Sequence, residues 1–290
     1  MSEIISLKNF SLTYAPGTAL QRLALQDINL SVAKGEYRAL IGPQGSGKST
    51  LLQVMAGLLT GEGQVTVAGL DLRPAKNRDQ LWRQVGLVFQ YPERQLFEDT
   101  VFNDVAYGPR NLGLNEAEVQ RRVRAALAAV NLPPETHRLS PFKLSGGQQR
   151  RAAIACVLAM EPRLLLLDEP TAGLDPRAKG QLMDLFSRLC REKQVTVVLV
   201  THDMEEVAHR ADKVTVLSQG RVVLEGCPRQ VFACRSRLAE IGLALPFAAQ
   251  LAGALQEKGL PVRQMTTMAE AERQVAELLH RCSKIKRAGG

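Results

Sequence analysis

The chain has 290 residues, of which 45% are hydrophobic, and its net charge is +8 at neutral pH. This length is enough for one large α/β domain with an appendage, or for two modest domains. The longest apolar runs, at 164–167 and 195–200, are far too short to cross a bilayer, which excludes a membrane-spanning protein. The start, MSEIISLKNF, lacks the features of a secretory signal, so we expect a cytoplasmic protein.

The cysteines and the net charge exclude fewer classes of protein than the length and the hydrophobic pattern do. No CxxC pair occurs among the five scattered cysteines, so we expect neither a disulfide framework nor a zinc site. These cysteines are Cys156, Cys190, Cys227, Cys234 and Cys282. A pI near 9.4 suits nucleic acid, an anionic membrane surface or phosphorylated ligands, and the charge alone does not choose among them.

Short β-like runs alternate with helix-like stretches through the first 230 residues, which predicts an α/β protein with a mainly parallel central sheet. The runs before Gly35 have no long helix between them and predict an antiparallel β layer. Residues from about 93 to 160 are mostly helical and predict an inserted helical subdomain. The β-like runs are IISLKNF, DINLSV, YRALIG, QVTVAG, QVGLVF, RLLLLDE, VTVVLVT, KVTVLS and RVVLEG.

We interpret residues 231–290 as a small helical C-terminal domain, following a larger first domain at 1–230. Pro246 breaks its first helical stretch, and Thr267 with Glu270 predicts a capping box at the start of the last one. The apolar faces suit dimer contacts or packing on the domain's own chain. The basic tail at 281–290 is either a solvated end or a contact for a membrane or partner.

The stretch GPQGSGKS, at 42–49, matches the phosphate-binding loop G-x4-G-K-[ST]. It follows the apolar run YRALI and precedes the helix-like TLLQVMAGLL, which is the strand, loop and helix context that the motif requires. Glycines let the backbone amides wrap a triphosphate at a helix start. Lys48 is predicted to hold the β and γ phosphates and Ser49 to ligate Mg²⁺. The other predicted ATP contacts of the loop are Gly42, Pro43, Gln44, Gly45, Ser46, Gly47 and Thr50.

A second run, LLLLDE at 164–169, predicts a buried strand that ends in two acids. By itself it is better interpreted as a strand followed by a polar turn. Beside a phosphate loop, it delivers the carboxylates that Mg²⁺ and an attacking water require. We therefore expect Asp168 to act through the metal shell and Glu169 to orient or deprotonate the water.

Further motifs occur in a fixed order, and with them the chain resembles the nucleotide-binding subunit of an ATP-binding cassette (ABC) transporter. LSGGQ at 144–148 is similar to the family signature, Gln90 to the Q-loop, AGLD at 172–175 to the D-loop and His202 to the switch histidine. The resemblance covers roughly residues 3–230. It implies a P-loop NTPase of the ABC type, with an antiparallel β layer and an inserted helical subdomain.

The resemblance also implies roles for these residues. Tyr14, which singly is a packing residue of a β layer, would stack on adenine, and Gln90 would touch Mg²⁺. His202, which singly is a turn residue, would donate to the γ phosphate and sense its loss. Because the signature of one subunit faces the phosphate loop of another in this family, a second set would contact ATP of the opposite chain. That set is Ser145, Gly146 and Gly147. Gln148 of the signature and Asp175 of the D-loop are further predicted ATP contacts.

The stretch at 89–114 resembles the ATPase subunits of energy-coupling-factor (ECF) transporters, importers of vitamins and transition metals. YAPGT at 14–18 and LPFAAQLAGALQEKGLPV at 245–262 extend the likeness, and Pro43-Gln44 inside the loop departs from it. The resemblance implies an ATP-hydrolysing pair of like or different chains, docked at the cytoplasmic face of the membrane on a T-component that carries a substrate-binding S-component. It does not name the solute.

Other readings remain, although the ECF importer is favoured. A binding-protein-dependent importer is the main alternative. A cassette acting on DNA needs a long coiled-coil insertion, yet only 97 positions separate Lys48 from Ser145, and we expect no nucleic-acid partner. A translation-factor type carries two cassettes, whereas each motif occurs once here. A regulatory cassette without activity would be expected to lose Lys48 or Glu169, and both are present.

Overall fold

The computed structural model describes residues 2–288, with side chains up to His280. The expectations for Cys282 and for the basic tail therefore lie outside the described side chains. In residues 2–288, no helix combines the length and the apolar character needed to span a membrane. No disulfide links the four cysteines of this part of the chain, which are free thiols.

An antiparallel sheet forms the first layer, with its strands in the order β2-β1-β4-β5. The strands are β1 (Glu3–Tyr14), β2 (Arg22–Ala33), β4 (Glu62–Val67) and β5 (Leu70–Asp71). The antiparallel layer predicted before Gly35 is thus present, and β4 and β5 enlarge it. β1 pairs with both β2 and β4, and register shifts interrupt both pairings.

A six-stranded sheet forms the centre of the molecule, in the order β10-β9-β3-β8-β7-β6. Its strands are β3 (Tyr37–Ile41), β6 (Val85–Val88), β7 (Leu164–Asp168), β8 (Thr196–Val200), β9 (Lys213–Ser218) and β10 (Arg221–Gly226). All neighbours are parallel except β9 and β10, with Leu165 opposite Val197 and Ala39 opposite Leu199. The mainly parallel sheet expected from the sequence is confirmed.

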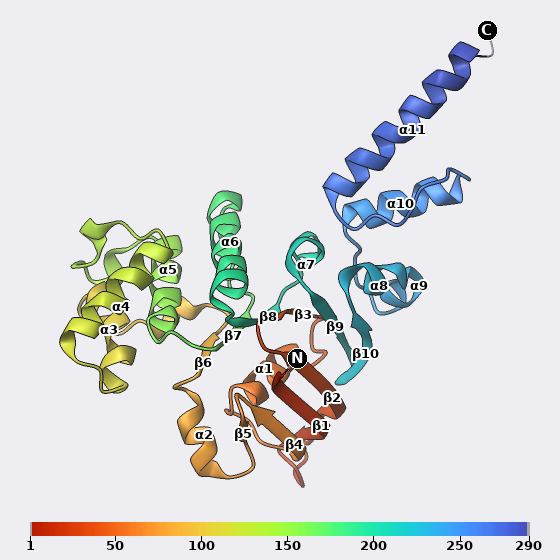
Figure 1. Cartoon of the computed structure of the whole chain (residues 1–290). Coiled ribbons are helices and arrows are strands. Elements are labelled where there is room, and N and C mark those ends of the chain that lie inside the picture. The colour runs from red at the N-terminus through yellow and green to blue at the C-terminus, as the bar shows by residue number, and fades with distance from the viewer. Residues whose placement is uncertain (1, 289–290) are drawn as a thin grey trace.

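Helices cover this sheet and fill the long connections. They are α1 (Lys48–Met55), α2 (Ala75–Leu81), α3 (Val101–Asn111), α4 (Glu116–Ala129), α5 (Gly146–Leu158), α6 (Pro176–Lys193) and α7 (Met204–Arg210). Short 3₁₀ turns lie at Pro92–Gln95, Pro134–Thr136 and Pro141–Lys143. Figure 1 shows α3, α4 and α5 together at the left of the view, away from the antiparallel sheet at the lower right. Residues 93–160 are mainly helical, as expected.

Two hydrophobic cores lie on opposite faces of the central sheet. Leu165 and Leu167 of β7 belong to the core shared with α3–α6. Leu164 and Leu166 belong to the core shared with the antiparallel sheet and α1. Because successive side chains of a strand point to opposite faces, an unbroken leucine run can serve both cores. This double coverage explains why the strand reads as continuously apolar.

The C-terminal segment is helical: α8 (Pro228–Ala233), α9 (Arg235–Glu240), α10 (Phe247–Glu257) and α11 (Met268–Ala288). Phe232 and Leu238 pack into a core with Ile41 of β3, whereas α10 and α11 share a separate small cluster. α11 extends away from the rest of the chain (Figure 1). The division into domains at residue 230 stays a prediction.

The capping box predicted for α11 forms only in half. Thr267 Oγ1 accepts from the backbone N–H of Glu270 at 3.4 Å. The Glu270 carboxylate instead accepts from the backbone N–H of Thr266 at 2.7 Å, one residue before the predicted donor. Thr266 and Thr267 therefore both help to cap the start of α11, but the reciprocal pair of hydrogen bonds between Thr267 and Glu270 does not form.

Candidate active site

Four neighbouring parallel strands bring the predicted ATP-site residues to one edge of the central sheet. The phosphate loop follows β3, and Gln90 and His202 follow β6 and β8 closely. β7 ends in Asp168, and Glu169 comes next. Ligands bind in α/β sheets at the carboxyl ends of the strands. A cavity of about 760 Å³ opens there, and its walls include Tyr14, Gln44, Gly45, Gly47, Lys48, Ser49, Thr50, Gln90, Glu169 and His202.

The phosphate loop passes too close to its neighbours for most side chains. A Cβ atom on Gly42 would lie 2.2 Å from the backbone oxygen of Leu217, at the end of β9. Gly47 precedes α1 with a φ of 102°, and a Cβ atom there would lie 2.9 Å from the backbone oxygen of Ala24. Only glycine fits such positions, so the loop can lie tightly against β2 and β9.

Lys48 is held at this loop by its own backbone. Its Nζ donates to the carbonyl oxygens of Gly42 at 2.7 Å and of Pro43 at 2.9 Å, and only 6% of the residue is exposed. Burial lowers the pKa of the Lys48 amine, while the carboxylates of Glu169 and Asp168 act to raise it. The amine is therefore oriented and desolvated, which strengthens its attraction for an anion in the cavity.

Asp168 and Ser49 supply adjacent oxygen atoms. The Ser49 side chain hydrogen-bonds to the Asp168 carboxylate, whose pKa is raised by burial and, more weakly, by Glu169. The Ser49 hydroxyl, the Asp168 carboxylate and the Gln90 side-chain oxygen are hard ligands of the type that Mg²⁺ prefers. Phosphate oxygens and waters would complete its coordination. The residues present fit a magnesium ion bound together with a triphosphate.

Glu169 joins two other predicted residues at the mouth of the cavity. Its Oε2 accepts from Gln90 Nε2 at 3.1 Å, and its Oε1 lies 2.9 Å from His202 Nε2. The backbone of Glu169 has a φ of 47°, a left-handed conformation that L-residues rarely adopt, and its N–H donates to the oxygen of Val200. Such strain persists where surrounding structure enforces it, commonly at functional sites.

Tyr14 closes the cavity on the side of the antiparallel sheet. Its hydroxyl lies 3.2 Å from Thr50 Oγ1, on the first helix after the phosphate loop, and the residue is 39% exposed. This contact fixes the direction of the phenol without covering the ring. The ring is thus available as a flat apolar surface beside the phosphate loop.

The signature residues lie outside this cavity. Ser145 caps α5: its Oγ accepts from the Gln148 N–H at 3.3 Å, and the Gln148 side chain accepts from the Ser145 N–H at 3.0 Å. Gly146 continues the exposed first turn. Asp175 caps α6 by accepting from the N–H groups of Arg177 and Ala178. None of the five signature and D-loop residues lines the cavity within the chain.

Several residues of the cavity wall carried no motif in the sequence. Arg22, Leu23 and Ala24 come from β2, and Gln219 and Gly220 form the turn between β9 and β10. The Gly220 N–H donates to the Ser46 oxygen, which ties this turn to the phosphate loop. Only the strand order places these residues at the cavity. Because β9 pairs with β3, the turn after β9 lies beside the phosphate loop after β3.

Comparisons with known proteins agree with this geometry. The family model described as ABC transporter matches residues 25–172. The energy-coupling factor transporter ATP-binding protein EcfA2 of Symbiobacterium thermophilum is 52% identical over 261 residues, covering 89% of this chain and 90% of that protein.

Solved structures give the same picture. CbiO1 of Clostridium perfringens, part of the ABC transporter complex CbiONQ, is 36% identical with a TM-score of 0.73, covering 89% of this chain and all of that one. The ATP-binding cassette MJ0796, in a dimeric post-hydrolysis state with ADP and Pi, is 32% identical with a TM-score of 0.71. That match covers 78% of this chain and 99% of that one. The chain therefore belongs to the ABC transporter family, and within it to the ATP-binding proteins of energy-coupling factor transporters.

Proposed function

We propose that the cavity at the carboxyl edge of the central sheet binds MgATP, and that ATP hydrolysis there drives an ECF-type importer. The observation that carries this proposal is the contact of Glu169 with both Gln90 and His202, opposite Lys48 of the phosphate loop. A base, a polar amide and an imidazole converge where the γ phosphate of an ATP on this loop would lie. Hydrolysis requires this combination of water activation and phosphate recognition.

Each side chain then has a definite task. Lys48 binds the β and γ phosphates, together with the amides of the loop. Ser49, Asp168 and the Gln90 carbonyl oxygen would hold Mg²⁺, which neutralises phosphate charge when it is bound. Glu169 orients the attacking water and accepts its proton. His202 donates to the γ phosphate, and Tyr14 stacks on adenine.

The signature acts on a second chain. At the start of α5, Ser145 and Gly146 are exposed and Gly147 is partly buried, yet none of the three lines their own chain's cavity. Such a start binds phosphate well because free amides and the helix dipole favour an anion. The dimeric MJ0796 cassette with ADP and Pi supports pairing by analogy. ATP shared between two chains holds the pair closed, and hydrolysis releases it.

Mixing two inactive variants tests the pairing. Ser145→Arg blocks the signature and Lys48→Ala disables the phosphate loop, so a mixed pair retains one composite site without either lesion. The variants carry different tags, and tandem purification isolates mixed pairs only. We expect their ATPase activity to exceed that of either variant alone. Activity no higher than that of the single variants would contradict action in trans.

Membrane partners are inferred from the relatives and from one surface. Relatives named as ECF transporter ATP-binding proteins, and CbiO1 of a CbiONQ complex, indicate a second ATPase and membrane subunits. Near the Q-loop, Phe97 is 59% and Tyr107 48% exposed, with their rings edge to face at 5.1 Å. An exposed aromatic pair in the segment that follows Gln90 suits docking of a helix from a membrane T-component. A third, S-component would bind the vitamin or metal.

Purification from the native host tests this assembly. The tagged chain is extracted with mild detergent, and proteins that co-purify are identified by mass spectrometry. We expect a related ATPase with polytopic membrane proteins and attachment at the cytoplasmic face. Recovery with a separate solute-binding protein would instead favour a binding-protein-dependent importer. Recovery with ribosomes or DNA and no membrane protein would refute the importer function.

A further inference from the structure

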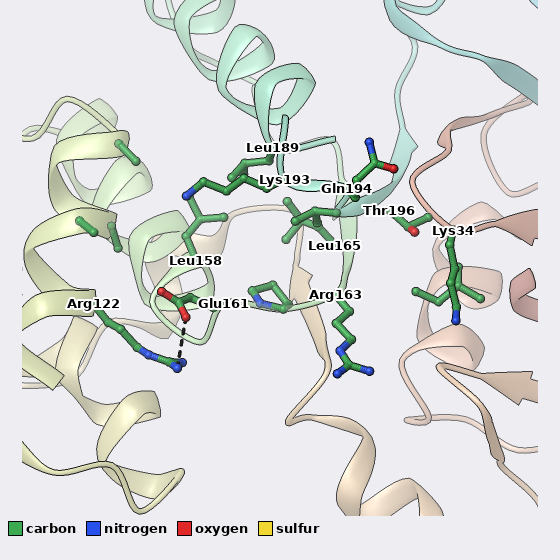
Figure 2. A pocket seen from close by; sticks show the side chains of 16 residues that line it. Lys34, Arg122, Leu158, Glu161, Arg163, Leu165, Leu189, Lys193, Gln194 and Thr196 are labelled. Atoms are coloured by element: carbon green, nitrogen blue, oxygen red, sulfur yellow. Dashed lines mark ion pairs between the residues drawn. The ribbon is translucent and has the colours of Figure 1, made fainter. Parts of the chain in front are cut away.

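A second cavity lies at the opposite edge of the central sheet from the ATP site. Its volume is about 580 Å³, and Leu165 and Thr196 place it at the amino ends of β7 and β8. Figure 2 shows side chains from α4 and α5 at the left, from α6 above and from the antiparallel sheet at the right. The cavity therefore lies between the helical region, whose helix α5 carries the signature, and the central sheet, whose strand β3 leads into the phosphate loop. Its size is that of a small-molecule site.

Small apolar side chains create the space. Ala125, Ala126 and Ala129 of α4 line one wall, and Leu158 at the end of α5 and Leu189 of α6 continue it. Larger residues at the three alanine positions would fill the gap between α4 and the sheet. The resulting wall can take an apolar body out of water, which favours binding of a ligand with an apolar part.

The rim of this cavity is cationic. Lys34, Arg163 and Lys193 border it, and in the described part of the chain none of the three has an acidic group within 4.0 Å. In Figure 2, the Lys193 amine lies at the left beside Leu158, the Arg163 side chain extends toward the bottom of the view, and Lys34 lies at the right beside the antiparallel sheet. Three positive charges without counter-ions thus surround an apolar floor.

The one carboxylate in the lining does not offset these charges. Glu161 accepts from Arg122 Nη2 at 3.1 Å and from Arg121 Nη2 at 3.0 Å. Figure 2 draws the ion pair of Arg122 and Glu161 at the left, where it links α4 to the segment just after α5. Because Glu161 is committed to these arginines, the charge facing the cavity is positive. An occupant must bring the negative charge.

We propose that this rear cavity binds a small amphipathic anion, with an apolar body against the α4 alanines and an acidic group at Lys193, whose amine lies on the Leu158 side of the cavity (Figure 2). Charge complementarity selects the head, because the Lys193 amine can make a charge-assisted hydrogen bond to it, while Arg163 and Lys34 add positive charge across the cavity. The cavity volume and the apolar wall select the body. This site is separate from the ATP cavity, and the proposal does not depend on the roles proposed for the residues of the ATP cavity.

Fluorescence titration tests the site with a matched pair of probes, in saturating MgADP so that the ATP cavity is filled. The probes are 1-anilinonaphthalene-8-sulfonate and its uncharged analogue N-phenyl-1-naphthylamine. We expect one saturable sulfonate site per chain and about tenfold weaker binding of the uncharged analogue. Equal affinity for the two probes would overturn the proposal, because the cations would then contribute nothing.

Variants locate the bound probe. Lys193→Glu should weaken sulfonate binding by about tenfold, and Arg163→Glu, on the other side of the cavity, should weaken it less. Arg188→Glu changes the same charge on α6 outside the cavity and should leave the affinity unchanged. Ala129→Trp fills the cavity and should abolish binding, and Ala125→Trp at an exposed position serves if that protein does not fold. Equal effects of Lys193→Glu and Arg188→Glu, or none from either, would show that the probe binds elsewhere.

Discussion

Helices α1 and α5 both begin beside glycines, but their first turns differ in construction. α1 follows Gly47 in a left-handed conformation, has no side-chain cap, and starts with the buried Lys48. α5 starts behind Ser145, whose side chain and backbone exchange hydrogen bonds with Gln148, and Ser145 and Gly146 at this start are exposed. The first start lies in a cavity of its own chain, whereas the second faces outward.

The difference follows from what each start needs. Uncapped amides at α1 leave donors for phosphate, and Lys48 is already oriented by the oxygens of Gly42 and Pro43. At α5 the capping box keeps the turn formed in water without a ligand. A helix start that is stable alone and exposed is suited to meet a ligand presented by another molecule. The two starts thus suit the two halves of a shared site.

The largest expected effect comes from removing the cation at α1. Lys48→Ala should abolish MgATP binding, because no other lysine lines the described cavity. A nucleotide titration measures this, and Lys213→Ala, an exposed lysine at the start of β9, is the matched control. Thermal melting checks that the variant folds. Normal affinity in the folded variant would remove α1 as the phosphate site.

A smaller effect separates chemistry from binding. Glu169→Gln keeps the size of the side chain but removes its basic carboxylate, so MgATP should still bind while hydrolysis falls by about 10²–10⁴-fold. Steady-state turnover and nucleotide affinity are measured together. Glu192→Gln, on the exposed surface of α6, should change neither. Turnover at the wild-type rate would assign the water to another group.

The smallest effect compares an acid near α1 with one in the helical region that carries α5: Asp168 is partly buried and Asp104 is buried. Asp168 is bonded to Ser49, but in the helical region Asp104 is only 4% exposed and its Oδ2 has no partner among the described residues. Its Oδ1 accepts from the N–H groups of Phe97 and Glu98 at 3.1 Å. Burial raises the pKa of Asp104 despite these bonds. A raised pKa in the folded state means that stability is lost as pH rises through that value.

Asp104→Asn should remove this loss while keeping the acceptor for both N–H groups. The Tm of the variant relative to wild type should therefore rise from acidic pH, near the ordinary carboxyl pKa of about 4, toward neutral pH. Melting curves across that range measure it. Asp99→Asn, an exposed acid nearby, is the control. A difference in Tm that stays constant with pH would show that ionisation of Asp104 costs nothing.

Local patterns in the sequence were enough to locate most elements near the ATP site. The apolar runs at 37–41 and 164–168 form β3 and β7, and the glycine-rich loop precedes α1. These patterns work because burial on both faces and tight turns each restrict residue type locally. The half-formed cap of α11 shows where local patterns fail. The backbone N–H groups of Thr266 and Thr267 are both possible donors to the Glu270 carboxylate, and only the surrounding fold selects that of Thr266.

The sequence alone determined the chemical parts of this ATPase: Lys48 and Ser49 in the loop, two acids after a strand, and a signature serine before a helix. Only the tertiary structure decided which parts meet. It set the order of β6, β7, β8 and β3, so that Glu169 contacts both Gln90 and His202, and it brought Arg22 and Gln219 to the same cavity. It also kept Ser145 outside that cavity. Strand order and packing depend on contacts between distant segments, and a local pattern does not record them.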